Sequence, residues 1–540
     1  MASPATTTTG RKPPVSTWAP LREPFFRMLW AAAFVSNIGT WMQNVGAVAL
    51  MTQVTASSVL VALLQTAATL PAFLLSLPAG ALADLVDRRR LLLFAQAWMA
   101  VTALLLGALV VLGFGTPWLL LGFTFVLGLG AALTTPVWVA VMTEVVPPEQ
   151  LPAAAALNGL SFNLARAVGP ALGGLVIGYF SVGASFVLNG LSFLAIVWVI
   201  WRWQREPQPP VTMAAERLFS AMRGGLRYAR FSLPLQVILL RSAAFLFGAS
   251  ALFALLPVVA QGLHAPAATY SVLLTCMGAG AVLGAFVLPV FNQRFGVDAR
   301  VNILTGVFAA VVAYLGFADN VWALGAVMVV AGAAWLLVLN VLSVAVQTAV
   351  PRWVLARSIS FYLLVTQGAT AVGSLAWGAA AERFGLTNGL VAAAGCMALT
   401  LLLAGRYALR RGENLDFSTV QHWAEPSTIL PLTPGAGPVV VTIAYRVALA
   451  NQPDFAQLMA KMAHIRRREG ALSVMLYTDL ADPERLVEQY VFESWEEHRA
   501  ERMRGMGSEE TQLYRQVRAL HKGDAPPVVT HLPAASPTKD

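Results

Sequence analysis

The chain has 540 residues, of which 57% are hydrophobic and only 12% are charged, and its mean hydropathy is +0.66. Soluble globular domains are about 25% charged, so this composition excludes an ordinary soluble enzyme, a disordered scaffold and a disulfide-stapled secreted domain. The formal net charge of +9 divides into +12 for residues 1–415 and −3 for residues 416–540. Two unlike parts are therefore expected, one basic and apolar, the other acidic and polar.

Twelve segments of the chain are long and apolar enough to cross a membrane, which takes about 20 mostly apolar residues. The polar stretch 1–20 precedes them and lacks the apolar core of a cleaved signal peptide, so we expect a short disordered tail there. The predicted spans are 26–53, 57–83, 90–113, 116–145, 151–180, 183–203, 234–260, 266–291, 300–318, 321–349, 355–380 and 386–408.

The distribution of arginine predicts the orientation of these spans. If the N-terminus is cytoplasmic, the inner loops carry thirteen arginines and the outer loops carry only Arg383. The positive-inside rule then predicts a multi-pass protein of the cell inner membrane with both termini in the cytoplasm. Because the basic residues report topology, we expect no nucleic-acid partner. The partners that we expect are membrane lipid and a small-molecule substrate.

An internal repeat relates the two halves of the apolar region. A shift of 204 residues aligns them without a gap and superimposes glycines, which mark close helix packing. A longer basic loop, 204–233, lies between the halves. Six spans plus six, joined by such a loop, are typical of parallel-repeat transporters, whose substrate site lies near the membrane midplane between the halves. The superimposed pairs are Gly80 and Gly284, Gly128 and Gly332, Gly169 and Gly373, and Gly174 and Gly378.

The loop after the second span carries a recognisable signature. Residues 80–90 resemble the G-x-L-x-D-R-x-G-R-R motif of the major facilitator superfamily, although Leu85 and Asp87 depart from it. The resemblance implies a cytoplasmic gate in which Asp84 caps a helix or pairs with an arginine. A plain positive-inside anchor is the alternative. Leu288 replaces the acid in the second half, so the gate is one-sided. Its residues are Gly80, Asp84, Arg88 and Arg89.

The fifth span carries a second motif. Its G-P-x-x-G-G sequence resembles the antiporter motif of exporting members of the superfamily, with Ala165 where an earlier glycine is expected. The proline removes a backbone donor, and the glycines let the helix bend and pack closely. A generic membrane kink is the alternative. The motif residues are Gly169, Pro170, Gly173 and Gly174.

Residues 22–411 as a whole resemble the transmembrane secretion effector branch of the superfamily, which contains the enterobactin-exporter-like proteins. The resemblance is carried by the two motifs together with Ser36 to Asn44, Leu64-Gln65, Leu70-Pro71, Asn158 to Gly174 and Leu188-Asn189. It implies an all-α membrane protein with the twelve-helix major facilitator fold, built from two six-helix repeats. It also implies export of small molecules, siderophores among them.

Two arginines lie deep within predicted spans, whereas no Asp or Glu lies in the middle of one. Arg166 stands roughly 22 Å beyond the start of its span, too far to reach back to the surface. Its partners should be carbonyls, amide side chains, water or an anionic substrate, and a structural role is the alternative. Arg241 aligns with Asn37 in the repeat, at the depth where this superfamily has its central cavity.

Six amides complete the predicted substrate pathway, and for each a helix–helix hydrogen bond is the alternative. They are Asn37, Gln43, Gln65, Asn163, Asn340 and Gln367. Without a carboxylate at the midplane, proton coupling is left to Asp84, to Glu144 at the end of the fourth span, or to an ionisable substrate.

The pattern changes to period two from about residue 438. Strands at 439–447, 471–479, 485–493 and 527–532 alternate with helices at 454–468, 495–504 and 508–521, the first capped by Asp454. The order βαββαβ predicts a small α+β ferredoxin-like cytoplasmic domain. Its segment 490–498 resembles the antibiotic-biosynthesis-monooxygenase-like group, which implies pairing into a homodimer. His464, His498 and Trp495 either line a cleft or pack in the core.

These features predict a transporter that exports a siderophore- or drug-like molecule by alternating access with proton coupling. The alternative is a transporter fused to a functional cofactor-free monooxygenase or ligand-sensing domain. No catalytic residue, metal site or cofactor is predicted, and Cys276 and Cys396 are expected to be buried free thiols. The predicted divisions are a tail (1–21), a first half (22–203), a central loop (204–233), a second half (234–411), a linker (412–437), a ferredoxin-like domain (438–533) and a polar tail (534–540).

Overall fold

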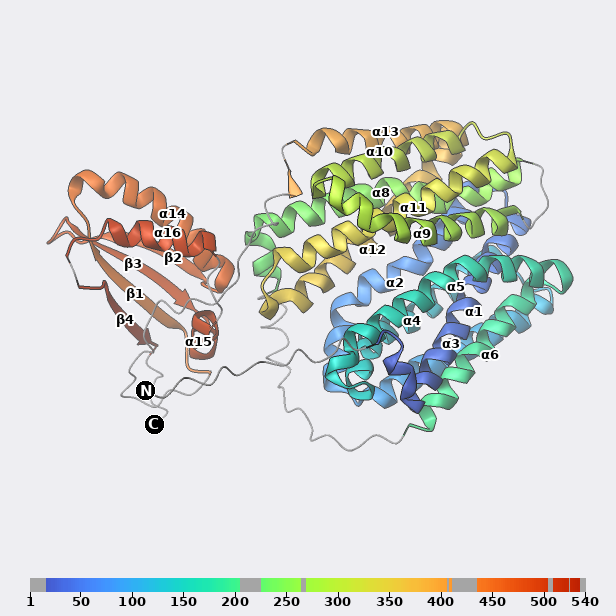
Figure 1. Ribbon diagram of the computed structural model, residues 1–540, viewed down its shortest axis with the longest axis horizontal. Helices are drawn as coiled ribbons and strands as arrows, with labels where there is room; N and C mark the ends of the chain where they lie inside the picture. The colour runs from blue at the N-terminus through green and yellow to red at the C-terminus, as the bar shows by residue number, and fades with distance from the viewer. Residues whose placement is uncertain are drawn as a thin grey trace, which may run out of the picture.

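The computed structural model describes residues 16–203, 225–263, 269–405, 407–409, 435–503, 508–523 and 525–534. A bundle of long helices occupies most of it, and a smaller domain with a β-sheet lies beside one end of the bundle (Figure 1). The long helices in the described residues are α1 (Pro24–Val54), α2 (Ser58–Leu85), α3 (Arg88–Val111), α4 (Pro117–Val145), α5 (Leu151–Tyr179), α6 (Val182–Trp201), α8 (Leu233–Gly262), α9 (Thr269–Arg294), α10 (Val297–Leu315), α11 (Val321–Ala349), α12 (Arg352–Phe384) and α13 (Leu386–Leu403).

Ten of these helices, α2 to α6 and α8 to α12, are long and apolar enough to cross a membrane. The helix α13 is a shorter apolar helix, and α1 is not among the ten although it has 31 residues. The prediction of spanning segments is therefore confirmed for ten of the twelve. Large apolar side chains stand exposed around the bundle, as they must where lipid is the solvent. Examples are Val101, Phe286, Trp322 and Leu402.

Local sequence fixes the helix boundaries. Side-chain oxygens at several N-caps accept a hydrogen bond from the first turn and so satisfy a backbone donor that the helix leaves free. Between α12 and α13, Gly385 has a φ of +91°, which favours glycine and sharply ends α12. The capping residues are Ser57 for α2, Asp87 for α3, Thr116 for α4, Ser181 for α6 and Asn320 for α11.

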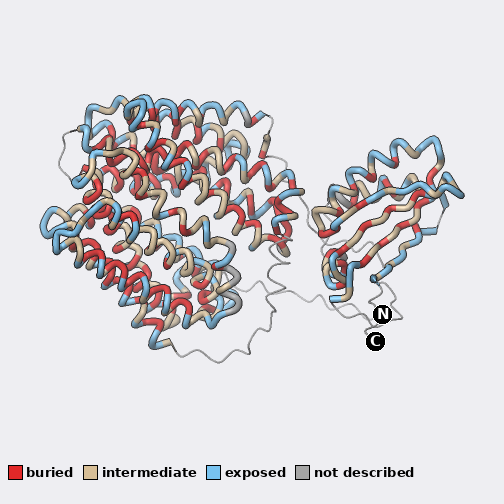
Figure 2. The backbone as a smooth tube through the Cα atoms, turned by 180° about the vertical axis from the view of Figure 1, so that it is seen from behind, coloured by how far each residue is buried: buried red, intermediate tan, exposed pale blue. Residues whose placement is uncertain are grey.

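The helix contacts of one half recur in the other. In the first half α1 packs on α5 and α6, and α3 packs on α6; in the second, α8 packs on α12 and α13, and α10 packs on α13. Gly169 lies against Trp41 of α1, and its repeat partner Gly373 lies against Phe247 of α8. This superimposed pair of glycines therefore occupies equivalent close approaches between helices. Figure 2 shows the buried residues concentrated inside the bundle.

The two halves meet mainly through α2 with α12 and α5 with α9. The Ser57 hydroxyl donates to the Glu382 carboxylate at 2.6 Å, and the Thr66 hydroxyl donates to the Ala371 carbonyl at 2.9 Å. In Figure 1, α12 and α2 lie next to each other across the boundary between the halves. The halves are thus joined by direct hydrogen bonds as well as by packing.

The Ser57–Glu382 hydrogen bond between the halves lies at one end of the bundle. There α1 and α8 both end, and the Gln261 amide donates to the Thr52 carbonyl at 2.6 Å. Gly174, near the end of α5, lies against Ser271 at the beginning of α9. Arg88 and the helical segment 225–231 lie at the opposite end. The contacts described here therefore close the end of the bundle that is remote from the loop between α2 and α3.

The C-terminal domain contains a four-stranded sheet with the order β2-β3-β1-β4, in which every neighbouring pair is antiparallel. Buried and partly exposed residues alternate along β1 and β3, as the predicted period requires. The buried face supports a core that includes Val441, Phe455 and Phe492. The elements are β1 (Val439–Arg446), α14 (Gln452–Glu469), β2 (Ser473–Thr478), β3 (Arg485–Phe492), α15 (Trp495–Met503), α16 (Ser508–Ala519) and β4 (Val528–Pro533).

Two smaller expectations were wrong. The N-cap of α14 is Asn451, without a side-chain hydrogen bond, and Asp454 lies in the first turn of the helix. The carboxylate of Asp454 is therefore placed to interact with the helix dipole rather than to cap the helix. Cys276 and Cys396 are free thiols, as predicted, but each is only partly buried.

Candidate substrate pathway

Arg166 lies midway along α5 between two tryptophans that come from different halves of the bundle. Its guanidinium carbon is 5.7 Å from the ring centre of Trp41 on α1 and 5.9 Å from that of Trp335 on α11. The residue is only 9% exposed. Within the described part of the chain, its guanidinium makes no hydrogen bond and no ion pair. A central arginine costs about 3 kcal/mol or more in a membrane unless it is partnered, and the two ring faces offset only part of that.

The helix that carries Arg166, α5, forms part of the seam between the halves, through its contact with α9. A Cβ on Gly173 would come within 3.1 Å of the Met42 backbone, so α5 packs tightly on α1. On its other side, a Cβ on Gly174 would lie 2.8 Å from the Ser271 hydroxyl of α9. Pro170 is buried between these approaches. The motif glycines therefore let α5 contact its own half and the opposite half at once.

Arg241, the second deep arginine, has a complete set of partners. It makes an ion pair with Asp298 at 3.5 Å, donates to the Tyr407 carbonyl at 3.3 Å and donates to the Asn302 side chain. Asp298 also accepts from the backbone N–H of Leu409 at 2.9 Å. Arg241 thus holds α8, α10 and the segment after α13 together inside the second half. These contacts favour a structural role over cargo binding.

The predicted amides differ in what they contact. Gln43 is buried, and its side-chain oxygen accepts from Asn189 of α6 at 2.6 Å, which is the helix–helix alternative. Asn163 donates to the Gly159 carbonyl within its own helix at 2.9 Å. The structure leaves Asn37, Gln65 and Gln367 partly exposed and Asn340 exposed. The side chains of Gln43 and Asn163 thus make hydrogen bonds within the first half. The other four amides are at least partly exposed.

The predicted gate is described only in part, because the side-chain positions of Gly80 and Asp84 lie outside the described residues. Arg88 makes an ion pair with Glu144 at the end of α4, with 2.8 Å between nitrogen and oxygen. Arg89 donates to the carbonyls of Ile200 and Trp201 at 3.1 and 2.6 Å. A positive charge at this position interacts favourably with the dipole at the C-terminal end of α6. Both arginines therefore link helices within the first half, Arg88 to α4 and Arg89 to the end of α6.

Reasoning from sequence did not assign a role to Trp41, Trp335 or Asp298. The tryptophans come from α1 and α11, and only the fold brings them to α5. Asp298 falls just before the predicted span 300–318, whereas α10 begins at Val297. No spacing in the sequence links these residues to the arginines that they contact.

A sequence model of the transmembrane secretion effector family matches residues 15–538, which include both the bundle and the C-terminal domain. The chain belongs to this family of MFS-type transporters. It is accordingly a transporter rather than an enzyme. Two curated relatives from Bacillus subtilis (strain 168) are described as uncharacterized MFS-type transporters. One, YfkF, is 29% identical over 139 residues, which are 26% of this chain and 34% of YfkF. The other, YfiS, is 27% identical over 185 residues, which are 33% of this chain and 43% of YfiS.

The transporter therefore matches less than half the length of either curated relative. Its fold is similar to that of a bacterial homolog of the human lysosomal transporter Spinster, solved in an inward-facing and unoccupied conformation. The TM-score is 0.56 at 15% identity, and the match covers 73% of this chain and 97% of that one. This likeness shows the fold of the bundle.

The C-terminal domain of the transporter contacts the bundle through the segment 225–231. Arg227 makes an ion pair with Glu497 of α15. Phe231 meets the ring of His464 edge to face at 5.4 Å. The Arg468 guanidinium carbon lies 5.7 Å from the Tyr228 ring. Burial raises the pKa of Tyr228 to about 12. The central loop of the transporter thus supplies the surface on which the domain docks.

The aromatic residues predicted to line a cleft in this domain have packing contacts. His498 is buried, and its ring lies 5.1 Å from Phe492 and 5.5 Å from Trp495. His464 contacts Phe231 across the interface with the bundle. These contacts favour the packing alternative over a catalytic cleft.

Proposed function

We propose that this transporter exports a small, siderophore- or drug-like molecule from the cytoplasm by alternating access. One observation carries the proposal: the G-P-x-x-G-G segment of α5, which resembles the motif of exporting members, lies in the seam between the halves. Gly173 meets α1 there and Gly174 meets α9. Rocking of one half against the other must change the contacts between this helix and α9.

The distribution of arginine supports an inner-membrane protein with twelve spans and with both termini and the C-terminal domain in the cytoplasm. With that orientation, the closed end of the bundle faces outward, because α1 ends there and α2 begins there. Contacts between the halves at this outer end support a state that receives cargo from the cytoplasm. Export would proceed as the α2–α12 and α5–α9 contacts separate.

Proton coupling is the energy source that we propose. The candidate carriers are Asp84, an ionisable cargo and Glu144, which is ion-paired with Arg88 at the cytoplasmic end of α4. Protonation of Glu144 would release Arg88 and loosen that end of the first half. The ion pair therefore supports a role for Glu144 in which charge state and conformation change together.

For the C-terminal domain we propose a ferredoxin-like fold and a role in assembly, including pairing of two copies. The strand order β2-β3-β1-β4 supports the fold. A ligand-sensing domain is the second candidate, and its docking on the segment 225–231 favours it. A cofactor-free monooxygenase is less well supported, because His498 and Trp495 pack in the interior.

Inverted membrane vesicles test the export proposal. We expect vesicles that contain the transporter to accumulate at least one member of a panel of siderophores and aromatic drugs when a proton gradient is imposed. Dissipating the gradient should abolish the accumulation. Uptake by right-side-out vesicles, with none by inverted ones, would show an importer and contradict the proposal.

A further inference from the structure

We propose that Arg166, Trp41 and Trp335 form a recognition site for a flat aromatic molecule that carries a carboxylate or a similar oxyanion. The inference rests on the export function proposed above and names the class of cargo.

The charge of Arg166 calls for an acceptor that the described residues do not supply. A guanidinium has five N–H donors and no acceptor. Arg166 is only 9% exposed, and it has no hydrogen bond or ion pair in the described part of the chain. Arg241 at a similar burial has Asp298. A ligand oxyanion that accepts two parallel N–H bonds would do for Arg166 what Asp298 does for Arg241.

The two tryptophans add a requirement for an aromatic group. Each ring lies within 6 Å of the Arg166 guanidinium carbon and is only partly buried. Aromatic rings stack on tryptophan with a preference beyond the area that they bury. A flat ring attached to the oxyanion would therefore contact an indole while its charge meets Arg166. A cationic ligand would be repelled at the same place.

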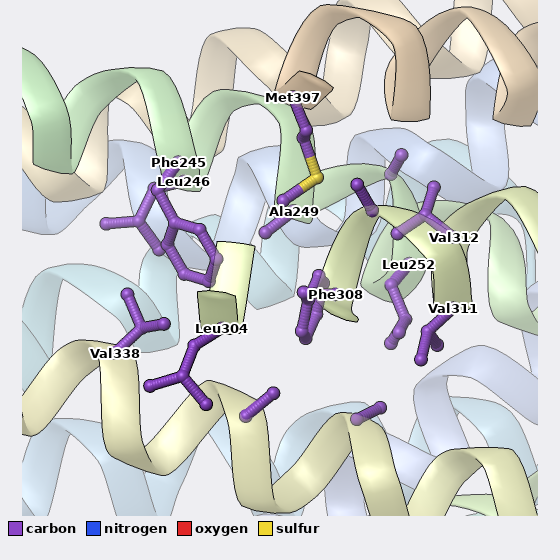
Figure 3. Close-up of a cluster of buried hydrophobic side chains, with 14 of the residues drawn as sticks. Phe245, Leu246, Ala249, Leu252, Leu304, Phe308, Val311, Val312, Val338 and Met397 are labelled. Atoms are coloured by element: carbon purple, nitrogen blue, oxygen red, sulfur yellow. The ribbon is translucent and has the colours of Figure 1, made fainter. Parts of the chain in front are cut away.

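Both tryptophans are held firmly. Trp335 lies 4.7 Å from the Phe253 ring and 5.9 Å from the rings of Phe245 and Phe308. Phe245 and Phe308 belong to the cluster between α8 and α10 that Figure 3 shows. Trp41 lies against Gly169. The aromatic surfaces are therefore positioned by packing within each half, which reduces the ordering that a ligand must impose.

The site spans the seam, so its occupancy depends on conformation. Arg166 and Trp41 belong to the first half and Trp335 to the second. A ligand that touches all three binds only while α5 and α11 are close together. Separation of the halves removes Trp335 and lowers affinity, which is what release on the far side requires.

Binding measurements by calorimetry on the full chain in phosphatidylcholine nanodiscs test the inference. The probes are 2-naphthoate, the neutral 2-naphthylmethanol and the non-aromatic cyclohexanecarboxylate. We expect 2-naphthoate to bind at least about 10-fold more tightly than either of the others, since loss of a charged hydrogen bond has about that effect. Equal affinities for the three probes would overturn the proposal.

Variants locate the binding. Arg166→Gln should weaken 2-naphthoate binding by about 10- to 100-fold and leave 2-naphthylmethanol unchanged. Trp335→Leu should weaken both aromatic probes and leave cyclohexanecarboxylate unchanged. Arg202→Gln is the matched control, because Arg202 is exposed and lies 4.4 Å from the ring centre of Trp198. Unchanged 2-naphthoate affinity in Arg166→Gln, or an equal loss in Arg202→Gln, would overturn the assignment.

A second arm separates a soluble cargo from a lipid headgroup. Phosphatidylglycerol added to the nanodiscs should leave the affinity for 2-naphthoate unchanged. Loss of that binding in wild type would show that Arg166 takes lipid phosphate and would overturn the proposal. Binding of 2-naphthoate by a protein that exports no member of the panel would instead contradict the proposed function alone, and export of other compounds without 2-naphthoate binding would contradict this inference alone.

Discussion

Two regions of this transporter bury an arginine, and they treat its charge in opposite ways. In the C-terminal domain, Arg466 meets Glu501 at 2.9 Å and Glu488 at 3.4 Å, and it lies 4.6 Å from the Tyr490 ring. Burial alone would lower the pKa of Arg466, but Tyr490 and the two carboxylates raise it well above its ordinary value. In the bundle, Arg166 has two indole rings and no carboxylate among the described residues.

The difference separates structure from function. A buried charge whose partners are all supplied by the fold contributes to the folded state, and removing it leaves those partners stranded. A buried charge that lacks partners weakens the folded state and is retained for something that the fold does not contain. The two arginines should therefore respond to the same substitution with stability changes of opposite sign.

The largest effect is expected at Arg466. Arg466→Met leaves the carboxylates of Glu488 and Glu501 buried without their cation, and we expect the C-terminal domain to lose about 3–5 kcal/mol of unfolding free energy. Hydrogen exchange on β1 and β3 of the full chain measures this. Arg485→Met is the control, because its pair with Asp479 is exposed and exposed pairs contribute about 0–1 kcal/mol. Wild-type protection in Arg466→Met would refute the contrast.

Within the bundle, Arg241 and Arg166 provide the same contrast in one environment. Arg241→Met strands Asp298 and should destabilise the second half by about 3 kcal/mol. Arg166→Met removes an unpartnered charge and should stabilise the protein by roughly 1–2 kcal/mol, after the lost ring contacts are subtracted. Thermal unfolding midpoints in detergent report both. A loss of stability in Arg166→Met as large as that in Arg241→Met would mean that Arg166 is structural.

A smaller effect is expected where the two regions meet. The substitution Glu497→Arg places a second positive charge beside Arg227. It should weaken docking of the C-terminal domain on the segment 225–231 by about 1 kcal/mol. The double variant Arg227→Glu with Glu497→Arg should restore docking. Hydrogen exchange in the segment 225–231 and in α15 measures the change. Equal protection in the single and double variants would show that the pair does not hold the domain.

The sequence predicted the helices well, because each apolar span is long and bounded by caps, prolines or glycines. Predicted boundaries such as 151–180 lie close to those of α5 (Leu151–Tyr179). The depth of Arg166 followed from its place in that span. The residues that contact Arg166 could not be predicted from the sequence, because Trp41, Arg166 and Trp335 lie on three helices that only tertiary packing brings together. Arg241 illustrates the same limit: a predicted boundary a few residues late placed Asp298 outside α10 and concealed the ion pair.

The central claim is that Arg166 serves the cargo rather than the fold, and Arg166→Ala tests it most directly. Inverted vesicles with equal amounts of inserted wild-type or variant protein are given a proton gradient and radiolabelled 2-naphthoate. We predict accumulation by the wild type, and accumulation by Arg166→Ala no greater than in vesicles without the transporter. Accumulation by Arg166→Ala at the wild-type rate would contradict the account.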